Sequence, residues 1–295
     1  MKKDKERKHP IGIYLELIFF ICYGLGILEF VTGTEKVYHF LGIAFTFFPV
    51  LAAFITRGIT GEPGKFHLSL KVWKDPKSWL FSAFVPGILI ALGAVLYFLV
   101  FPNEYSGVFR YGMRLGTDAE VVIKFPLLIA LVCIIAAAIM IPIQLLELGE
   151  EIGWRGYLLG FQIEKYGKRK AVLINGVEWG LVHLPLVYFG FNYSLSNPGA
   201  PYTNMALMVV VCVILGIIFS YITIKTGNCM YAAIMHGVVN VIGELPVYMT
   251  HDTESGLLGP NPTGILAVSF LAVFSILLLI KMERAALKMR KELEI

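Results

Sequence analysis

Long runs of apolar residues alternate with short polar segments along most of the chain. Eight of these runs approach or exceed the roughly 20 helical residues needed to cross a hydrocarbon core about 30 Å thick. The runs are residues 11–31, 38–56, 79–101, 124–147, 170–190, 204–225, 228–249 and 263–280. The pattern predicts an all-α, polytopic membrane protein with eight transmembrane helices.

The composition supports this class. Hydrophobic residues make up 57% of the chain and charged residues only 16%, and the mean hydropathy is +0.73, far from the usual soluble balance. Since no internal repeat or soluble second domain is visible, residues 1–295 are expected to form one membrane domain, with tails at 1–10 and 282–295. The four cysteines show no C-x-x-C spacing, which argues against a disulfide framework or a cysteine metal site.

Basic residues predict the orientation, because Lys and Arg collect in cytoplasmic loops. If residues 1–10 are cytoplasmic, all but four of the 25 Lys and Arg residues fall on that side; the exceptions are Lys36, Arg110, Arg114 and Lys124. We therefore expect a multi-pass protein of the cell membrane with both termini in the cytoplasm. The net charge of +4 then reflects topology, and no nucleic-acid partner is predicted.

The segment between the second and third runs mixes apolar side chains with lysines. Residues 58–78 contain Phe66, Trp73 and four lysines. The mixture predicts either an interfacial segment on the cytoplasmic surface or an ordinary solvated loop.

Two adjacent glutamates interrupt the apolar pattern in E-L-G-E-E-I-G-W-R-G, residues 147–156. Charged groups in a membrane segment cost several kcal/mol unless they are paired or hydrated. On a helix, Glu151 and Arg155 are four residues apart and can pair, while Glu150 points about 100° away. The spacing predicts one structural carboxylate and one that is available; a salt-bridged helix end near the cytoplasmic surface is the alternative.

Two histidines lie inside later apolar runs. His183 follows Trp179 by one helical turn, and Asn240 follows His236 by the same spacing, so each pair is expected on one helix face. A single histidine in an apolar helix is more often a packing residue than a catalyst. Two histidines with a carboxylate cluster favour a functional site.

Depth in the membrane tests whether these groups can meet. Measured along helices from basic residues near the cytoplasmic boundary, His183 lies about 20 Å deep, His236 about 16 Å and Glu150 about 22 Å. The three groups can therefore occupy a similar depth. We expect them to line a polar, cytoplasm-facing cavity among the helices.

The ordered motifs E-E-x-x-x-R, aromatic-x-x-x-H and H-x-x-x-N resemble those of the CPBP family, also called the Abi or type II CAAX protease family of intramembrane endopeptidases. The resemblance covers residues 124–249, the expected catalytic core, and all motif positions are filled. Trp179 stands where the family usually has Phe, which keeps an aromatic wall.

The resemblance implies roles for the motif residues. Glu150 would be the base that activates water with His183, while His236 and Asn240 would hold the oxyanion. Glu151 and Arg155 would support the acidic helix. In a second version, Zn is bound by His183, His236 and Glu150, because a His₂Glu set suits catalytic zinc; the chain has no H-E-x-x-H motif.

The expected function is hydrolysis of a peptide bond at the cytoplasmic membrane face. The resemblance implies a peptide or lipidated-protein substrate, such as a prenylated C-a-a-X tail, with the lipid bilayer as the other partner. A proton-coupled transporter would show internal repeat symmetry and broken helices in corresponding halves, and the sequence shows neither sign. A non-proteolytic immunity or scaffold protein of the same family would lack a motif residue, whereas all are present. Glu147, Glu178 and Glu244 receive no assigned role.

Overall fold

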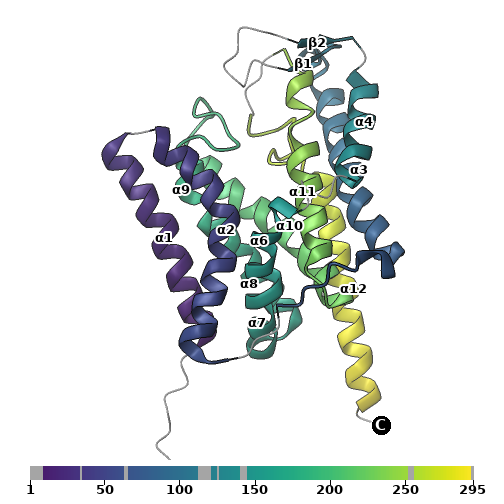
Figure 1. Cartoon of the computed structure of the whole chain (residues 1–295). Coiled ribbons are helices and arrows are strands. Elements are labelled where there is room, and N and C mark those ends of the chain that lie inside the picture. The colour runs from purple at the N-terminus through teal and green to yellow at the C-terminus, as the bar shows by residue number, and fades with distance from the viewer. Residues whose placement is uncertain are drawn as a thin grey trace, which may run out of the picture.

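The computed structural model describes residues 9–33, 35–62, 66–111, 121–124, 126–139, 145–251 and 256–293, and most of them are helical (Figure 1). The helices are α1 (Pro10–Thr32), α2 (Glu35–Thr60), α3 (Pro76–Val100), α4 (Pro126–Ile139), α6 (Leu148–Glu151), α7 (Leu159–Tyr166), α8 (Lys168–Val182), α9 (Leu184–Tyr188), α10 (Tyr202–Thr226), α11 (Met230–Gly243) and α12 (Ser269–Leu293). The short elements are η1 (Val72–Lys74), η2 (Pro102–Glu104), the π-helix η4 (Ile152–Leu158), η5 (Val247–Met249), and the antiparallel strands β1 (Phe109–Tyr111) and β2 (Val121–Ile123). The helical class of the prediction is confirmed.

Within the described residues, four segments are long and apolar enough to cross a membrane. They are α1, α3, α10 and residues 230–249, which include α11. The predicted count of eight is not confirmed. The second predicted run contributes a shorter apolar stretch, Phe45–Thr60, and the fourth lies partly outside the described residues.

The fifth predicted span is broken at His183. Helix α8 ends at Val182, His183 forms a turn, and α9 begins at Leu184. Pro185 causes the break, because proline lacks an N–H and its ring clashes with the carbonyl four residues earlier. That carbonyl, of Leu181, instead accepts a hydrogen bond from the Tyr23 hydroxyl of α1, at 2.9 Å.

Two glycines let α8 approach α10 closely. A Cβ atom at Gly176 would lie 2.8 Å from the Cα of Val213, and one at Gly180 would lie 2.7 Å from the Cα of Val209. Small residues four apart allow this kind of backbone approach between membrane helices. The contact matters for function because α8 carries Trp179 and leads into the turn at His183.

Replacement of Gly176 by Ala should therefore destabilise the protein by about 1–3 kcal/mol, as overpacking commonly does. The thermal unfolding midpoint of the detergent-solubilised protein measures this effect. Gly24→Ala is the matched control, because a Cβ there meets nothing within 4 Å. Equal midpoints for both variants would contradict the close packing of α8 on α10.

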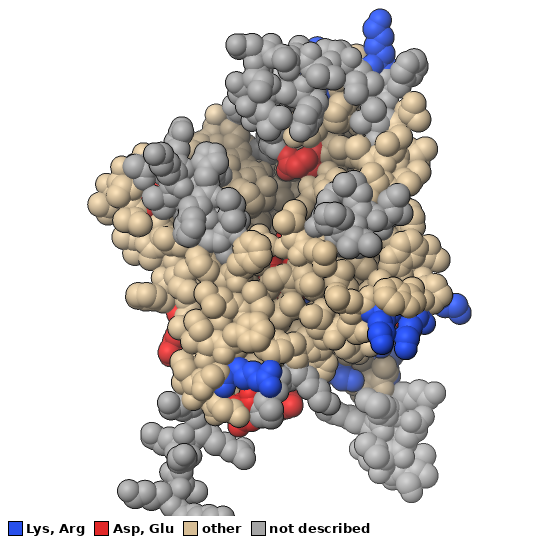
Figure 2. Space-filling view, in the orientation of Figure 1, with Lys and Arg blue, Asp and Glu red and all other residues tan. Residues whose placement is uncertain are grey.

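One end of the bundle carries most of the positive charge. Figure 2 shows most of the visible Lys and Arg side chains at the lower end of the molecule, where α1, α8 and α11 begin and where α2, α10 and α12 end. The loops at 189–201, 244–251 and 256–268 lie at the opposite end, as does the β1–β2 strand pair. The predicted gathering of basic residues on one side therefore matches the fold.

The segment after α2 crosses this basic end. The Ser69 backbone exchanges hydrogen bonds with the Asn228 side chain, at 2.9 and 2.8 Å, and the Tyr231 hydroxyl donates to the Val72 carbonyl at 3.0 Å. Of residues 66–75, only 72–74 form a helical turn. The segment is thus tied to the turn between α10 and α11 rather than being a freely solvated loop.

Candidate active site

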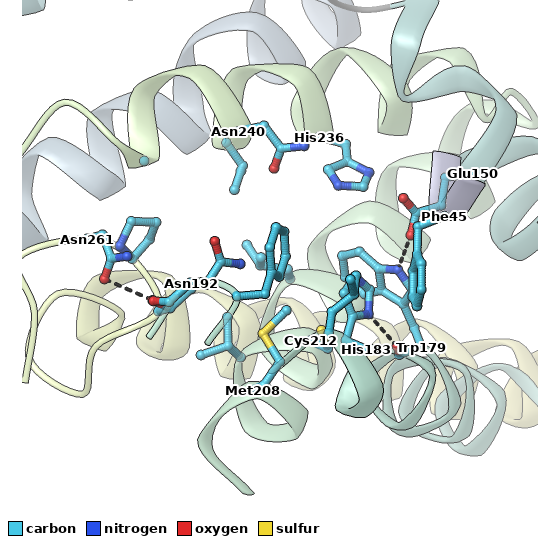
Figure 3. Close-up of a pocket in the computed structure, with 18 of the residues that line it drawn as sticks. Phe45, Glu150, Trp179, His183, Asn192, Met208, Cys212, His236, Asn240 and Asn261 are labelled. Atoms are coloured by element: carbon cyan, nitrogen blue, oxygen red, sulfur yellow. Dashed lines mark hydrogen bonds between the residues drawn. The ribbon is translucent and has the colours of Figure 1, made fainter. Parts of the chain in front are cut away.

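A cavity of about 700 Å³ lies among α2, α6, α8, α9, α10 and α11, and it is extended by the loops at 190–192 and 261–263. Glu150, Trp179, His183, His236 and Asn240 all contribute to its wall. Figure 3 shows His236 and Asn240 along one side and Trp179 and His183 along the other, with Glu150 at one end. The structure therefore brings together the residues that the three separate motifs supplied.

Glu150 is held by the aromatic residue of the second motif. The indole Nε1 of Trp179 donates a hydrogen bond to Glu150 Oε1, and Glu150 is only 5% exposed. A phenylalanine could not make this bond, because its ring carries no polar donor. Trp179 is therefore more than the aromatic wall that the sequence predicted.

His183 is oriented by its own helix. Its Nδ1 lies 2.7 Å from the Trp179 carbonyl oxygen, and its ring packs against Phe45 with centroids 5.4 Å apart. A carbonyl oxygen can only accept, so Nδ1 carries the proton. In the neutral ring, Nε2 is then the acceptor, which is the state that a base requires.

His236 lies between two carboxylates. Its Nδ1 is 3.0 Å from Glu151 Oε1, and its Nε2 is 3.7 Å from Glu147 Oε2. Asn240 follows one turn later on the same wall (Figure 3). The predicted shared face of His236 and Asn240 is confirmed, whereas the carboxylate partners of His236 were not predicted.

Glu151 forms the ion pair that its spacing predicted. Arg155 Nη1 lies 3.0 Å from Glu151 Oε1, with both side chains fully buried, although the backbone here is a π-helix rather than the expected α-helix. The Arg155 guanidinium also stacks over Trp179, at 4.2 Å from the ring centroid, and over Phe219 at 5.4 Å. Glu151 therefore links Arg155 to His236.

The glycines of the acidic motif have a packing role that the sequence analysis missed. A Cβ at Gly149 would overlap the Thr46 carbonyl oxygen, and one at Gly153 would overlap the backbone of Pro49. Helix α2 can approach the acidic motif only because these positions lack side chains. The i, i+4 spacing of Gly149 and Gly153 was the available sequence signal.

The three unassigned glutamates take different positions. Glu147 lies in the cavity wall beside His236, and Glu244 lines the cavity one turn beyond Asn240. Glu178 accepts a hydrogen bond from Gln162, which in turn accepts one from Asn175 at 3.0 Å. Glu178 therefore belongs to a buried network joining α7 and α8 and does not line the cavity.

A metal ion has one candidate position among the residues that the structure describes. Ligand atoms of Glu147, Glu150 and His236 all lie within 4.8 Å of one another. His183 is absent from this group, so the donor set differs from the one the sequence analysis considered. Glu147 replaces His183 as the third donor.

The cavity extends away from the basic end of the bundle. Its wall follows α11 from His236 to Glu244 and reaches residues 190–192 and 261–263, which lie in the loops at the opposite end. Both the cavity and the termini were predicted from the sequence to face the cytoplasm. These two expectations cannot both hold for this fold, because the termini lie at the other end.

Comparison with known proteins gives two matches. Residues 123–242 match the model of the family described as type II CAAX prenyl endopeptidase Rce1-like. A protein of Methanococcus maripaludis named CAAX prenyl protease 2 is 32% identical over 116 residues, which is 37% of this chain and 41% of that relative. The chain thus matches about two fifths of the length of this curated relative.

The matched region contains the motif residues that meet at the cavity. Glu150 and Glu151 come from α6, His183 from the break after α8, and His236 and Asn240 from α11, all within residues 123–242. Together with these ordered motifs, the two matches show that residues 123–242 are similar to the type II CAAX prenyl endopeptidases of the CPBP family.

Proposed function

We propose that this chain is an intramembrane endopeptidase in which Glu150 and His183 activate a water molecule. The observation that carries the proposal is that Glu150, His183, His236 and Asn240, from three separate segments, line one cavity. Hydrolysis of a peptide bond needs a base for the water and donors for the developing oxyanion. The cavity offers candidates for both.

Water activation uses two acceptors. The Trp179 indole donates a hydrogen bond to Oε1 of Glu150, so Oε2 can accept a hydrogen bond from water. The Nδ1–H of His183 donates to the Trp179 carbonyl oxygen, so Nε2 of His183 is the second acceptor. Glu150 takes the proton as the water oxygen attacks the carbonyl carbon. It then returns the proton to the departing amine, so that an acid and an amine leave the site.

Stabilisation of the oxyanion is assigned to His236 and Asn240. The Asn240 side-chain amide is a donor, and Nε2 of His236 is a donor when the ring is protonated. Glu151 fixes the ring by accepting from Nδ1 at 3.0 Å, and Arg155 fixes Glu151. Donors held in place before the reaction cost no reorganisation in the transition state.

A metal-assisted version of the same reaction uses Glu147, Glu150 and His236 as ligands. Two carboxylates and an imidazole within 4.8 Å fit a divalent cation such as Zn²⁺, which would make its bound water a nucleophile near neutral pH. His183 would remain free to accept a proton. Loss of turnover on prolonged chelation, with stoichiometric metal by elemental analysis, would support this version; full activity in metal-free protein would exclude it.

The substrate is proposed from the relatives. The CAAX prenyl names suggest a lipidated peptide, and an unmodified membrane-anchored peptide fits the same chemistry. The test incubates purified protein in detergent with a farnesylated C-a-a-X peptide and, separately, with an unmodified anchored peptide. Mass spectrometry should show one new carboxyl and one new amine terminus; two intact peptides would contradict the proposal and favour a non-proteolytic role.

Replacement of Trp179 by Phe should lower kcat about tenfold or more while KM changes little. The ring that covers Arg155 is kept, but Glu150 loses its donor, and hydrogen bonds to charged groups contribute about 1.5–3 kcal/mol. Trp73→Phe is the control, because Trp73 is 70% exposed at the basic end. An unchanged kcat for Trp179→Phe would show that Trp179 does not position Glu150.

A further inference from the structure

The position of the cavity relative to the charged end of the bundle can be followed along the helices that line it. Helix α10 begins at Tyr202, directly after the loop at 190–201, and descends to Thr226, while α11 rises from Met230 to Gly243. The cavity touches α10 from Met208 to Leu215 and α11 from His236 to Gly243. It therefore occupies the half of the bundle remote from the turn between α10 and α11.

Beneath the candidate catalytic groups, the bundle is tightly packed. Trp154, Arg155, Leu158 and Phe219 are each at most 1% exposed. The Arg155 guanidinium lies against the Trp179 ring, and Arg155 belongs to η4, which leads into α7 at the basic end. These side chains separate Glu150 and His236 from the loops that carry the lysines.

The segment at 66–74 closes the same end. It is tied to the turn between α10 and α11 through Asn228, Cys229 and Tyr231, and the Phe66 carbonyl lies against Gly156 of the π-helix. A peptide approaching from the basic end would have to displace this segment and the packed layer above it.

The mouth has a different chemical character. Asn192, Asn261 and Thr263 contribute neutral amide and hydroxyl groups to this part of the wall, and Glu244 contributes a carboxylate. Figure 3 shows Asn192 and Asn261 at the end of the cavity away from Glu150. Neutral amides can both donate to and accept from a peptide backbone, so this wall suits an extended polypeptide.

Charge fixes which side of the membrane the mouth faces. Lys and Arg collect on the cytoplasmic side of membrane proteins. Among the described side chains, the closed end carries Arg57, Lys71, Lys74, Lys77, Lys165, Lys168, Arg169, Lys170, Lys225, Lys281 and Arg284, whereas the end with the mouth carries Arg110 and Lys124. The closed end is therefore the cytoplasmic one.

We infer that the site opens to the non-cytoplasmic side of the membrane, where it takes an extended peptide segment presented at that surface. That the ligand is a peptide rests on the proposed function. The direction in which the cavity opens does not depend on it. The inference replaces the expectation of a cytoplasm-facing cavity, and it directs the search for substrates to exported or membrane-anchored polypeptides.

Thiol labelling tests the direction without requiring activity. The background carries Cys133→Ala and Cys212→Ala, which remove the half-buried thiol and the thiol in the cavity wall. Single cysteines are then introduced at Leu195 in the mouth-side loop, at Lys74 on the basic end, and at Thr46 in the cavity wall. Leu195 and Lys74 are exposed, and Thr46 is part-exposed.

Intact cells are treated with a small membrane-impermeant thiol reagent, and the labelled fraction is compared with that in opened cells. Leu195→Cys and Thr46→Cys should be labelled fully in intact cells, and Lys74→Cys only after the cells are opened. Labelling of Lys74→Cys alone in intact cells would overturn the orientation. If Thr46→Cys is labelled only under the conditions that label Lys74→Cys, the cavity opens at the basic end and the inference is overturned. The inference is also overturned if Thr46→Cys is labelled neither in intact nor in opened cells.

A second arm separates this inference from the proposed enzyme activity. The same protein is reconstituted in vesicles, its orientation is measured by labelling at Leu195→Cys, and an unmodified anchored peptide is added outside. Cleavage should rise in proportion to the vesicles that expose residue 195, and cleavage proportional to the opposite orientation would overturn the inference. If the labelling pattern holds but no peptide is cleaved from either side, the proposed hydrolysis fails and the direction of the cavity stands.

Discussion

Replacement of Glu150 by Gln is expected to lower kcat for peptide hydrolysis by about 10²–10⁴-fold, the usual contribution of a general base. Glutamine has the same shape, and its carbonyl oxygen can still accept from the Trp179 indole, so the site should keep its structure. What is lost is the ability to take a proton from water. The measurement is steady-state cleavage of the peptide that the wild type hydrolyses.

Glu178→Gln is the matched control for Glu150→Gln. Glu178 is a part-buried glutamate on α8 that accepts a hydrogen bond from Gln162, and it is not among the residues that line the cavity. Its replacement should leave kcat within a few-fold of the wild type. Similar losses for both variants would mean that any change of a buried carboxylate disturbs the protein, and wild-type turnover by Glu150→Gln would remove Glu150 as the base.

Replacement of Arg155 by Met should lower the free energy of unfolding by about 3–5 kcal/mol, because breaking a buried ion pair leaves an uncompensated charge. Glu151 would keep only His236 as a partner, and Trp179 and Phe219 would lose the guanidinium that stacks on them. The thermal unfolding midpoint in detergent should fall markedly. Turnover should fall as well, because Glu151 positions His236.

Two further variants test whether the effect of Arg155→Met comes from the buried ion pair. Arg169→Met removes the partner of Glu283 in an exposed ion pair, with side chains 56% and 47% accessible, and it should cost less than about 1 kcal/mol. The double variant Arg155→Met with Glu151→Gln should regain part of the lost stability, because the buried charge is removed. Equal effects of Arg155→Met and Arg169→Met would contradict a buried network beneath the site.

Local spacing predicted the parts of the site that lie within one helix or one turn. The pairing of Glu151 with Arg155 and the shared face of His236 and Asn240 depend only on the i, i+4 geometry. Similar depth in the membrane, estimated from the nearest basic residues, also indicated that Glu150, His183 and His236 can meet. These predictions hold because they require no knowledge of how the helices pack.

Contacts between distant segments could not be predicted in this way. Glu151 and His236 are 85 residues apart, and Trp179 reaches Glu150 across 29 residues. Whether the Glu151 carboxylate reaches the His236 ring, or the Trp179 indole reaches Glu150, depends on how α6, α8 and α11 cross. The crossing of these helices cannot be read from a single sequence. For the same reason the sequence predicted Trp179 only as an aromatic wall, and its hydrogen bond to Glu150 could not be predicted.

The direction of the cavity is the clearest case in which local reasoning was insufficient. Depth along a helix places His183 and Glu150 inside the membrane, but it does not say which end of the bundle is packed shut. That depends on the segment at 66–74 and on the layer around Arg155, whose positions follow from tertiary contacts. Pro185, by contrast, was a readable signal, because proline predicts the break at which His183 sits.

The central claim is that Glu150 activates a water molecule in this cavity to hydrolyse a peptide bond. The most direct test is cleavage by wild type, Glu150→Gln and Glu178→Gln in H₂¹⁸O, with the products read by mass spectrometry. We expect wild type and Glu178→Gln to yield a fragment whose new carboxyl group contains ¹⁸O, and Glu150→Gln to yield almost none. Labelled product from Glu150→Gln at the wild-type rate would contradict the account.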